Sequence, residues 1–465
     1  MVGLTRSTCH MPTARMDFVT RQLSDNPVTD PLDSDSAVQR QPWPEVTKIA
    51  FRFCFLYFGL FCLLFAQITF AFLGIVGHWL PDRAVMWQMT VLGPVVGWVG
   101  RHVFGVEAVL HQDSGSGDQA AIWVMIFCLL VFSVVGTAVW SWVDRQRQDY
   151  SKLWAWFLTF VRLCVAGQML FYGFAKLIPT QMPAPPLAAL LRPYGEFSPA
   201  SVLWLQVGSS YPYEMALGAV EVVAGLLLFL PRTATLGALL GVASMVQVFL
   251  LNMTFDVPVK ILSGHLLLLG LVLLAPQYRR LADLLVLQRT TEPAVQPELF
   301  ADARANTIAT RVQAVLGIWM VAGCVLTGWQ SWSEYGGGRD KPDFYGIWTV
   351  SRFDVDGRTA PPLTTDQSRW QRVVFDLPEV LTYQRMDGKL VDAPLKVEDD
   401  KLSVSGPDGS ALATFTASRP TADRLQLTGE LSGRDVEIWL DRLDPDQFTL
   451  RNRGFHWVQE YPYFR

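Results

Sequence analysis

In this chain of 465 residues, 51% of the residues are hydrophobic and only 17% are charged, which is more apolar surface than one soluble core can bury. The composition therefore predicts an integral membrane protein and excludes an ordinary soluble domain. The formal net charge is −4, and the sequence has no basic stripe of the kind that binds nucleic acid, so we expect no nucleic-acid partner.

Residues 1–45 are polar and contain no apolar stretch of the kind that forms the centre of a signal peptide. They are rich in Ser, Asp, Pro and Arg, a composition typical of disorder. We expect a disordered tail on the cytoplasmic side of a membrane.

Seven apolar segments of near 20 residues are each long enough to cross ~30 Å of hydrocarbon. They cover residues 49–77, 121–143, 153–178, 213–230, 233–251, 259–275 and 308–328. Residues 84–110 are also apolar, but Gly93, Pro94 and Arg101 interrupt them. This segment predicts an interfacial or re-entrant piece, and an eighth span remains the alternative.

The basic residues of the short loops indicate an orientation, because Arg and Lys concentrate on the cytoplasmic side. They gather in every second loop, at Arg145, Arg147, Lys152, Arg232, Arg279, Arg280, Arg289 and Arg304. This bias predicts a multi-pass protein of a bacterial inner (plasma) membrane. Its amino terminus would be cytoplasmic, and everything after Gly328 would be periplasmic or extracellular.

The segments divide the chain into parts of different character. We expect two first spans within residues 46–150, a four-helix core at 151–287, a cytoplasmic linker at 288–307 and a last span at 308–328. An exported domain would follow at residues 341–465.

The exported domain has the two-residue period of strands. About ten short alternating segments follow Lys341, from GIWTVSRFDV to FTLRNRG and GFHWVQEY, with turn signals such as DG, GPDG and SG between many of them. They predict an antiparallel barrel or a tight sandwich. The opening Gly346-Ile347-Trp348 resembles the start of lipocalin-like barrels.

Charged residues inside the apolar segments are the best candidates for a functional site, because a membrane tolerates them only where they face inward. One helical face of residues 153–178 carries Arg162 and Lys176, and one face of residues 213–230 carries Glu214 and Glu221. Small residues alternate with these charges, which predicts close approach of the two helices.

Helix depth at 1.5 Å per residue suggests which charges meet. It places Arg162, Glu221 and His265 at one level, with Gln247 on a neighbouring segment. Lys176 fits Glu214 less well, and Glu196 or Asp256 are its alternative partners.

Two interpretations of this group stay open. Arg162 and Glu221 form an ion pair that fixes helix register, with His265 giving a neutral hydrogen bond. Alternatively, the same residues line a polar pocket that binds the head of a lipidic ligand or relays a proton.

The core resembles the DoxX-like membrane proteins over about 130 residues, from Ser151 to Leu285. RLCVAGQMLFYGFAKLIP has their early arginine and closing glycine-x-x-lysine, and EMALGAVEVVAGLLLFLPRTATLGALL resembles their second helix. The resemblance implies a four-helix membrane bundle. It also implies quinone-linked redox chemistry, because the family's name derives from a subunit of a thiosulfate:quinone oxidoreductase.

The remaining reactive residues show no catalytic or metal-binding pattern. Five of the six cysteines lie in apolar segments without CxxC spacing, which favours packing, and His78, His102 and His111 do not share a helical face. We therefore expect no metal site, and whether the chain is an enzyme stays open.

Two functions fit these observations. The first is a non-catalytic carrier or assembly component that holds a lipidic ligand or an envelope partner. The alternative is a quinone-linked membrane subunit of an oxidoreductase that depends on a partner for electrons.

Overall fold

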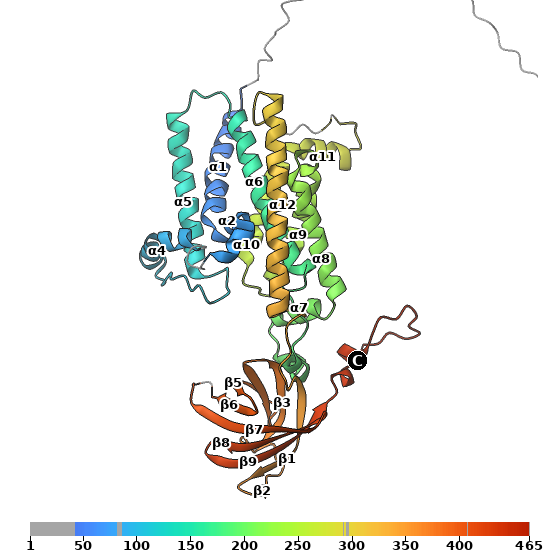
Figure 1. Ribbon diagram of the computed structural model, residues 1–465. Coiled ribbons are helices and arrows are strands. Elements are labelled where there is room, and N and C mark those ends of the chain that lie inside the picture. Colours follow the sequence, from blue (N-terminus) through green and yellow to red (C-terminus); the bar gives the residue numbers. More distant parts are fainter. Residues whose placement is uncertain (1–41, 81–85, 292, 294–296, 407, 465) are drawn as a thin grey trace, which may run out of the picture. The chain divides into compact units, whose positions relative to one another are not determined.

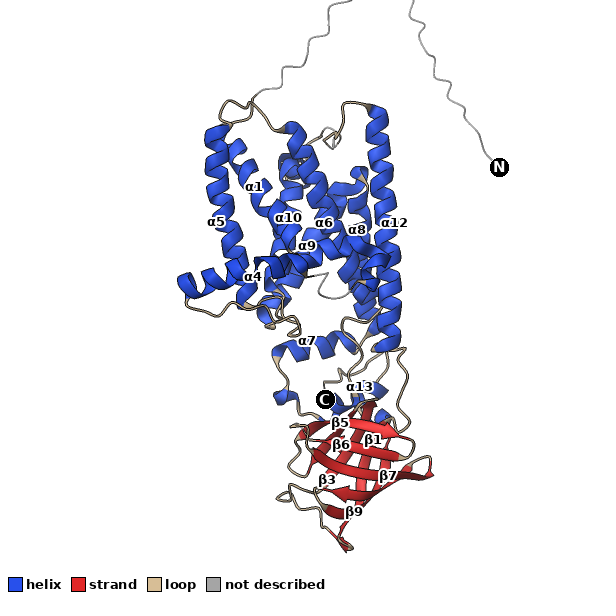
Figure 2. Cartoon of the chain, turned by 60° about the vertical axis from the view of Figure 1, so that its left-hand side comes forward, coloured by secondary structure: helices blue, strands red, loops and turns tan. Residues whose placement is uncertain are grey.

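The computed structural model of the chain describes residues 42–80, 86–291, 293, 297–406 and 408–464 (Figure 1). The tail predicted for residues 1–45 lies almost entirely outside the described residues. Helices dominate the chain as far as Glu334, and the long strands begin at Gly346 (Figure 2).

Seven described helices are long and apolar enough to cross a membrane, which confirms the predicted number of long apolar segments. They are α1 (Glu45–Leu64), α5 (Ala120–Val143), α6 (Ser151–Leu177), α8 (Tyr211–Phe229), α9 (Ala234–Thr254), the helical run Lys260–Leu285, and α12 (Ala303–Glu334). The sixth and seventh are longer than predicted. The sixth run consists of α10 (Lys260–Leu274), η6 (Ala275–Gln277) and α11 (Tyr278–Leu285). The Asp302 side chain caps α12, which begins at Ala303, so the linker before it is shorter than predicted.

Four of these helices form a core. Helix α6 packs on α8, α8 on α9, α9 on α10, and α10 on α6. Helices α8 and α9 are joined only by the short turn η5 (Pro231–Thr233), so they run antiparallel. Helix α1 packs on α5, and the long α12 runs alongside α6 (Figure 1).

Helices α6 and α8 approach each other as the small residues predict. A Cβ atom on Gly218 would lie 2.5 Å from the backbone nitrogen of Leu177, and one on Gly173 would lie 2.8 Å from that of Val222. Any larger side chain at these two positions would push the helices apart. The charged residues between the glycines are therefore held at close range.

The single span predicted for residues 49–77 is wrong in its second half. Helix α1 ends at Leu64, Phe65 is extended, and the chain continues as the short α2 (Ala66–Phe70) and the 3₁₀ segment η1 (Ala71–Trp79). Gly74 has φ +51°, and a Cβ atom on Gly323 of α12 would lie 2.5 Å from its Cα atom. Hydropathy alone does not distinguish this bent segment from a straight helix.

The apolar segment at residues 84–110 forms α4 (Trp87–Val99) followed by a π-helical turn, η2 (Gly100–Phe104). The 13 residues of α4 rise only about 20 Å, less than the ~30 Å thickness of hydrocarbon. Helix α4 by itself is thus too short to be an eighth straight span.

The chain after Gly346 is an antiparallel β-barrel, the first of the two predicted architectures. Its strands are β1 (Gly346–Val355), β2 (Arg358–Thr359), β3 (Trp370–Leu377), β4 (Val380–Arg385), β5 (Leu390–Glu398), β6 (Lys401–Ser405), β7 (Ala411–Thr421), β8 (Arg424–Leu431) and β9 (Arg434–Leu443). Strands β1 and β3 to β9 pair in order, and β9 pairs back onto β1 to close eight strands.

The interior of the barrel is filled by the inward side chains of the alternating strands. Trp348, Val373, Leu402, Leu425 and Ile438 are fully buried there. The indole nitrogen of Trp348 donates to the carbonyl oxygen of Phe344 at 2.8 Å. The tryptophan of the Gly346-Ile347-Trp348 opening therefore belongs to the core of the barrel.

The last two predicted strands are wrong. FTLRNRG begins at Phe448 and forms the short helix α13 (Thr449–Asn452), and GFHWVQEY has no strand pairing. The pairing of β9 with β1 leaves no open edge for a further strand. His456 and Trp457 are consequently exposed, and His456 does not lie in a final strand.

A short segment of the α6–α7 connection packs on the outside of the barrel. Leu187, in η3 (Leu187–Leu191), is buried against Ile347 and Val374, and its backbone nitrogen donates to the Asp376 carboxylate at 2.8 Å. Asp376 also accepts from Arg339. These contacts lie outside the barrel, so the interior core is complete without them.

We therefore expect a fragment of residues 341–465 to fold alone, because its strands close on one another and fill their own interior. Its circular dichroism should be rich in β-structure, with a cooperative thermal transition. The same fragment with Phe415→Asp should lose the transition, because Phe415 is buried in the interior. A helical or unfolded spectrum of the unsubstituted fragment would contradict the prediction.

Candidate functional site

Lys176 of α6 and Glu221 of α8 form a buried ion pair. The Lys176 Nζ atom lies 2.7 Å from Glu221 Oε2, and the two side chains are 7% and 2% exposed. The other carboxylate oxygen, Oε1, accepts from the Ser244 hydroxyl of α9 at 3.3 Å. Three helices of the core therefore meet at this pair.

The pair lines a cavity of about 270 Å³, which we call the ion-pair cavity. Its walls come from α6, α8, α9, α10 and α7 (Pro199–Gly208), and most of them are apolar, including Leu217, Val220 and Leu240. A cavity with apolar walls and a few fixed polar groups is typical of a small-molecule site.

The ion-pair cavity is open on the flank of the helices. Val220 of α8 is 48% exposed, and Ala243 and Gln247 of α9 are also exposed, yet all three line the cavity. At their turn the same two helices touch closely, because a Cβ atom on Gly237 would lie 2.9 Å from the carbonyl oxygen of Ala224. The opening thus lies between α8 and α9, away from their turn.

Further polar groups face the ion-pair cavity. Tyr172 lines it, and its hydroxyl accepts from Gln67 at 2.6 Å. On another wall, Asn252 donates to the Ser263 hydroxyl at 3.0 Å. These hydrogen bonds fix the side chains before any ligand enters.

The predicted ion pair between Arg162 and Glu221 is wrong. Arg162 donates to the carbonyl oxygen of Leu228 at 2.8 Å and to the side-chain oxygen of Gln313 on α12. Leu228 is seven residues beyond Glu221 on α8, a rise of about 10 Å. Counting residues from the inner end of each span misplaces Arg162 relative to Glu221, because α6 extends past the inner end of α8.

Lys176 also has a different partner from those predicted. Its backbone lies beside Gly218, one turn away from Glu221. In a helix the Cα–Cβ bonds tilt toward the amino terminus, so the lysine side chain reaches back to Glu221. Asp256 pairs with Lys260 instead, at 2.9 Å. Adding side-chain direction to the depth count would have favoured the correct pair.

His265 is separate from the ion pair. Its Nε2 atom lies 2.8 Å from the Tyr57 hydroxyl of α1, its Nδ1 atom lies 2.7 Å from the carbonyl oxygen of Ile261, and its ring stacks on Phe61 at 4.1 Å. The predicted group of Arg162, Glu221 and His265 is thus dispersed over three places. His265 joins α10 to α1.

Glu214 is fully buried near the start of α8. Its Oε1 atom accepts from the backbone nitrogen of Met182 at 2.9 Å, whereas Oε2 has no hydrogen-bond partner among the described residues. Glu214 therefore fixes the chain that follows α6 and does not line the ion-pair cavity.

Within the described ranges, no three His, Cys, Asp or Glu side chains are placed to share a metal ion. The described cysteines are free, with Cys62 and Cys164 buried between helices.

The described residues thus form seven helices that are long and apolar enough to cross a membrane, followed by an eight-stranded β-barrel. The chain belongs to the same family as the uncharacterized protein YwoB of Bacillus subtilis, to which it is 33% identical over 122 residues. The match covers 24% of this chain and 71% of YwoB. No family model matches the chain. No solved structure matches it either. The resemblance to DoxX-like proteins stays a prediction.

We expect Lys176→Met and Glu221→Gln each to destabilise the protein by about 3–5 kcal/mol, because each leaves one buried charge without its partner. The double variant should recover much of the loss, a coupling that unfolding curves in detergent can measure.

The exposed pair Lys396–Glu398 of the barrel provides the matched control. Lys396→Met and Glu398→Gln should leave the melting temperature unchanged, because solvent screens this pair. If the effects of Lys176→Met and Glu221→Gln simply add, the two residues do not interact.

Proposed function

We propose that this chain is an integral membrane protein that holds a lipidic ligand in the ion-pair cavity, as a non-catalytic carrier or assembly component. The observation that carries the proposal is the lateral opening of this cavity between α8 and α9. A lipidic molecule in the bilayer would enter through that opening without crossing water.

The charges of the cavity indicate the kind of head that it would hold. Lys176 and Glu221 neutralise each other, so a charged head would leave a net charge in an apolar site. A neutral head with an oxygen acceptor and a hydroxyl donor would satisfy both residues. Quinols and lipid alcohols have such heads, whereas a quinone has the acceptor alone. The apolar tails of all three suit the apolar walls.

A quinone-linked oxidoreductase subunit is the second candidate. It is supported by the presence of a proton donor, Lys176, and a proton acceptor, Glu221, on one wall of the cavity. A quinone carbonyl accepts a hydrogen bond from such a lysine, and a quinol hydroxyl donates one to such a carboxylate. Electrons would then come from a partner protein.

We also propose where the protein lies in the cell. In a bacterial inner membrane, the bias of Arg and Lys places the amino terminus in the cytoplasm and the β-barrel outside. The barrel would then face the periplasm or the medium, where it is available to an envelope partner.

Two substitutions on α8 test the ligand site. Val220→Trp should fill the opening and abolish retention of a lipidic ligand, measured by mass spectrometry of the protein purified in mild detergent. Val223→Trp is the matched control, because Val223 is 46% exposed on the same helix and does not line the cavity. It should keep the ligand, and both variants should melt as the unsubstituted protein does.

The identity of the retained molecule separates the two functions. A quinone, whose absorbance changes when it is reduced, favours the oxidoreductase subunit. A redox-inactive lipid favours the carrier. Equal retention by Val220→Trp and Val223→Trp would rule out this cavity as the site.

The orientation can be tested with reporter fusions. Fusions after Val143 and Gln288 should report cytoplasm, because the basic loops stay inside. Fusions after Gln181, Asp256 and Gly338 should report the exterior. An exterior signal at Gln288 would reverse the proposed topology.

A further inference from the structure

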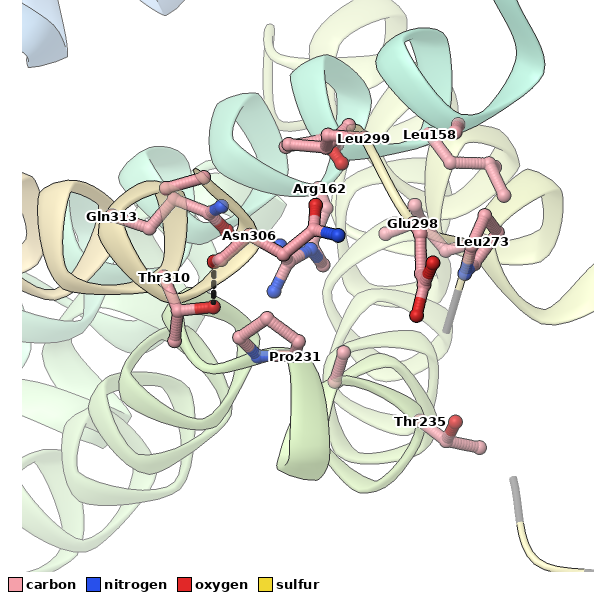
Figure 3. A pocket seen from close by; sticks show the side chains of 15 residues that line it. Leu158, Arg162, Pro231, Thr235, Leu273, Glu298, Leu299, Asn306, Thr310 and Gln313 are labelled. Atoms are coloured by element: carbon pink, nitrogen blue, oxygen red, sulfur yellow. Dashed lines mark hydrogen bonds between the residues drawn. The ribbon is translucent and has the colours of Figure 1, made fainter. Parts of the chain in front are cut away.

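A second cavity, of about 150 Å³, surrounds the buried guanidinium of Arg162. We call it the arginine cavity. It is lined by α6, the α8–α9 turn, α10, α12 and the segment at residues 297–299, and it shares no lining residue with the ion-pair cavity. Figure 3 shows the Arg162 side chain directed into the space between Pro231, Thr310 and Glu298.

Arg162 is a buried cation with neutral partners. It is 6% exposed, and its two hydrogen bonds go to a backbone carbonyl and to the amide oxygen of Gln313. In the part of the chain that the structure describes, no carboxylate forms an ion pair with it within 4.0 Å. Most buried arginines require such a partner.

The carbonyl that Arg162 contacts neutralises its charge only in part. Leu228 is the last residue but one of α8, so its oxygen belongs to the negative end of that helix. A helix end is equivalent to roughly half a negative charge, and this leaves about half of the positive charge uncompensated. The Arg162 side of the cavity therefore keeps a partial positive charge, although the Glu298 carboxylate also lines the cavity.

Two hydroxyl groups of this cavity suit an oxyanion. Thr159 and Thr235 each bring a hydroxyl to its walls, and both residues are only half-buried. A guanidinium has five N–H donors, of which Arg162 uses two, so three remain for a ligand. Guanidinium and hydroxyl groups together are a common set for phosphate oxygens.

The position of Arg162 is suitable for a lipid headgroup. It lies level with the end of α8, where that helix turns into α9. In a bilayer such a helix end lies near the headgroups and not at the centre. The distance of Arg162 from the start of α6 would not by itself indicate that it lies near the headgroups.

We propose that the arginine cavity binds a phosphate oxyanion, either that of a phospholipid headgroup or free phosphate. Glu298 lines the same cavity and is its one carboxylate among the described lining residues. Its negative charge opposes the binding of an anion. Substituting Glu298 therefore gives a prediction opposite in sign to that for Arg162.

The test uses the full chain in detergent with two probes, phosphatidylglycerol counted by native mass spectrometry and inorganic phosphate measured by calorimetry. Arg162→Gln should weaken binding at least about tenfold, the effect of losing a charged hydrogen-bond donor. Glu298→Gln should strengthen it about threefold, as expected for one charge across a partly solvated cavity. Arg311→Gln should change nothing, because Arg311 is exposed on α12 and does not line the cavity.

The two probes distinguish the sources of the phosphate. If phosphatidylglycerol alone follows this pattern, the ligand is a lipid headgroup, and if inorganic phosphate follows it, the ligand is a soluble anion. Should Arg162→Gln fail to fold, Glu298→Gln still decides, because Glu298 forms no ion pair with Arg162 within 4.0 Å. Unchanged binding of both probes to Glu298→Gln, or an equal loss in Arg311→Gln, would overturn the proposal.

Discussion

The close contact of α6 with α8 is the constraint on which the rest of the helical core depends. Gly173 and Gly218 allow the two backbones to touch, and at that separation the Lys176 Nζ atom lies 2.7 Å from Glu221 Oε2. The position of Glu221 in turn brings its second oxygen to Ser244 of α9. One backbone contact thus determines how three helices surround the ion-pair cavity.

A buried ion pair is a costly way to join two helices, because desolvation offsets most of its Coulomb energy. Apolar residues of the same size would hold α6 against α8 as well. The pair gives something that apolar residues do not, which is a donor and an acceptor at the wall of an otherwise apolar cavity. Under the proposed function, this donor and this acceptor recognise the polar head of the ligand.

Patterns within single segments predicted the fold well, whereas the site required contacts between segments. Hydropathy and the two-residue period gave the seven helices and the strands β1 to β9 apart from the two-residue β2, because burial along one element depends on that element alone. Of the residues predicted for an intramembrane site, Lys176, Glu221 and Gln247 line the ion-pair cavity, but the predicted partners of Lys176 are wrong. That choice depends on helix ends and side-chain direction, which the sequence determines only to within about one turn. The bend at Phe65 and the exposed end after Leu443 depend on packing and on closure of the barrel, which composition does not reveal.

The two cavities place opposite electrostatic demands on what they contain. In the ion-pair cavity, Glu221 neutralises Lys176, so a charged ligand would be penalised by the apolar surroundings. In the arginine cavity, the partners of Arg162 are a carbonyl and an amide, so a neutral ligand would leave the cation partly uncompensated. A molecule suited to one cavity is therefore poorly suited to the other. Arg162 and Lys176 are fourteen residues apart on α6, about 21 Å along its axis, so one helix contributes a cation to each cavity. The two cavities differ in charge because α8 gives Lys176 a carboxylate, whereas α8 and α12 give Arg162 a carbonyl and an amide.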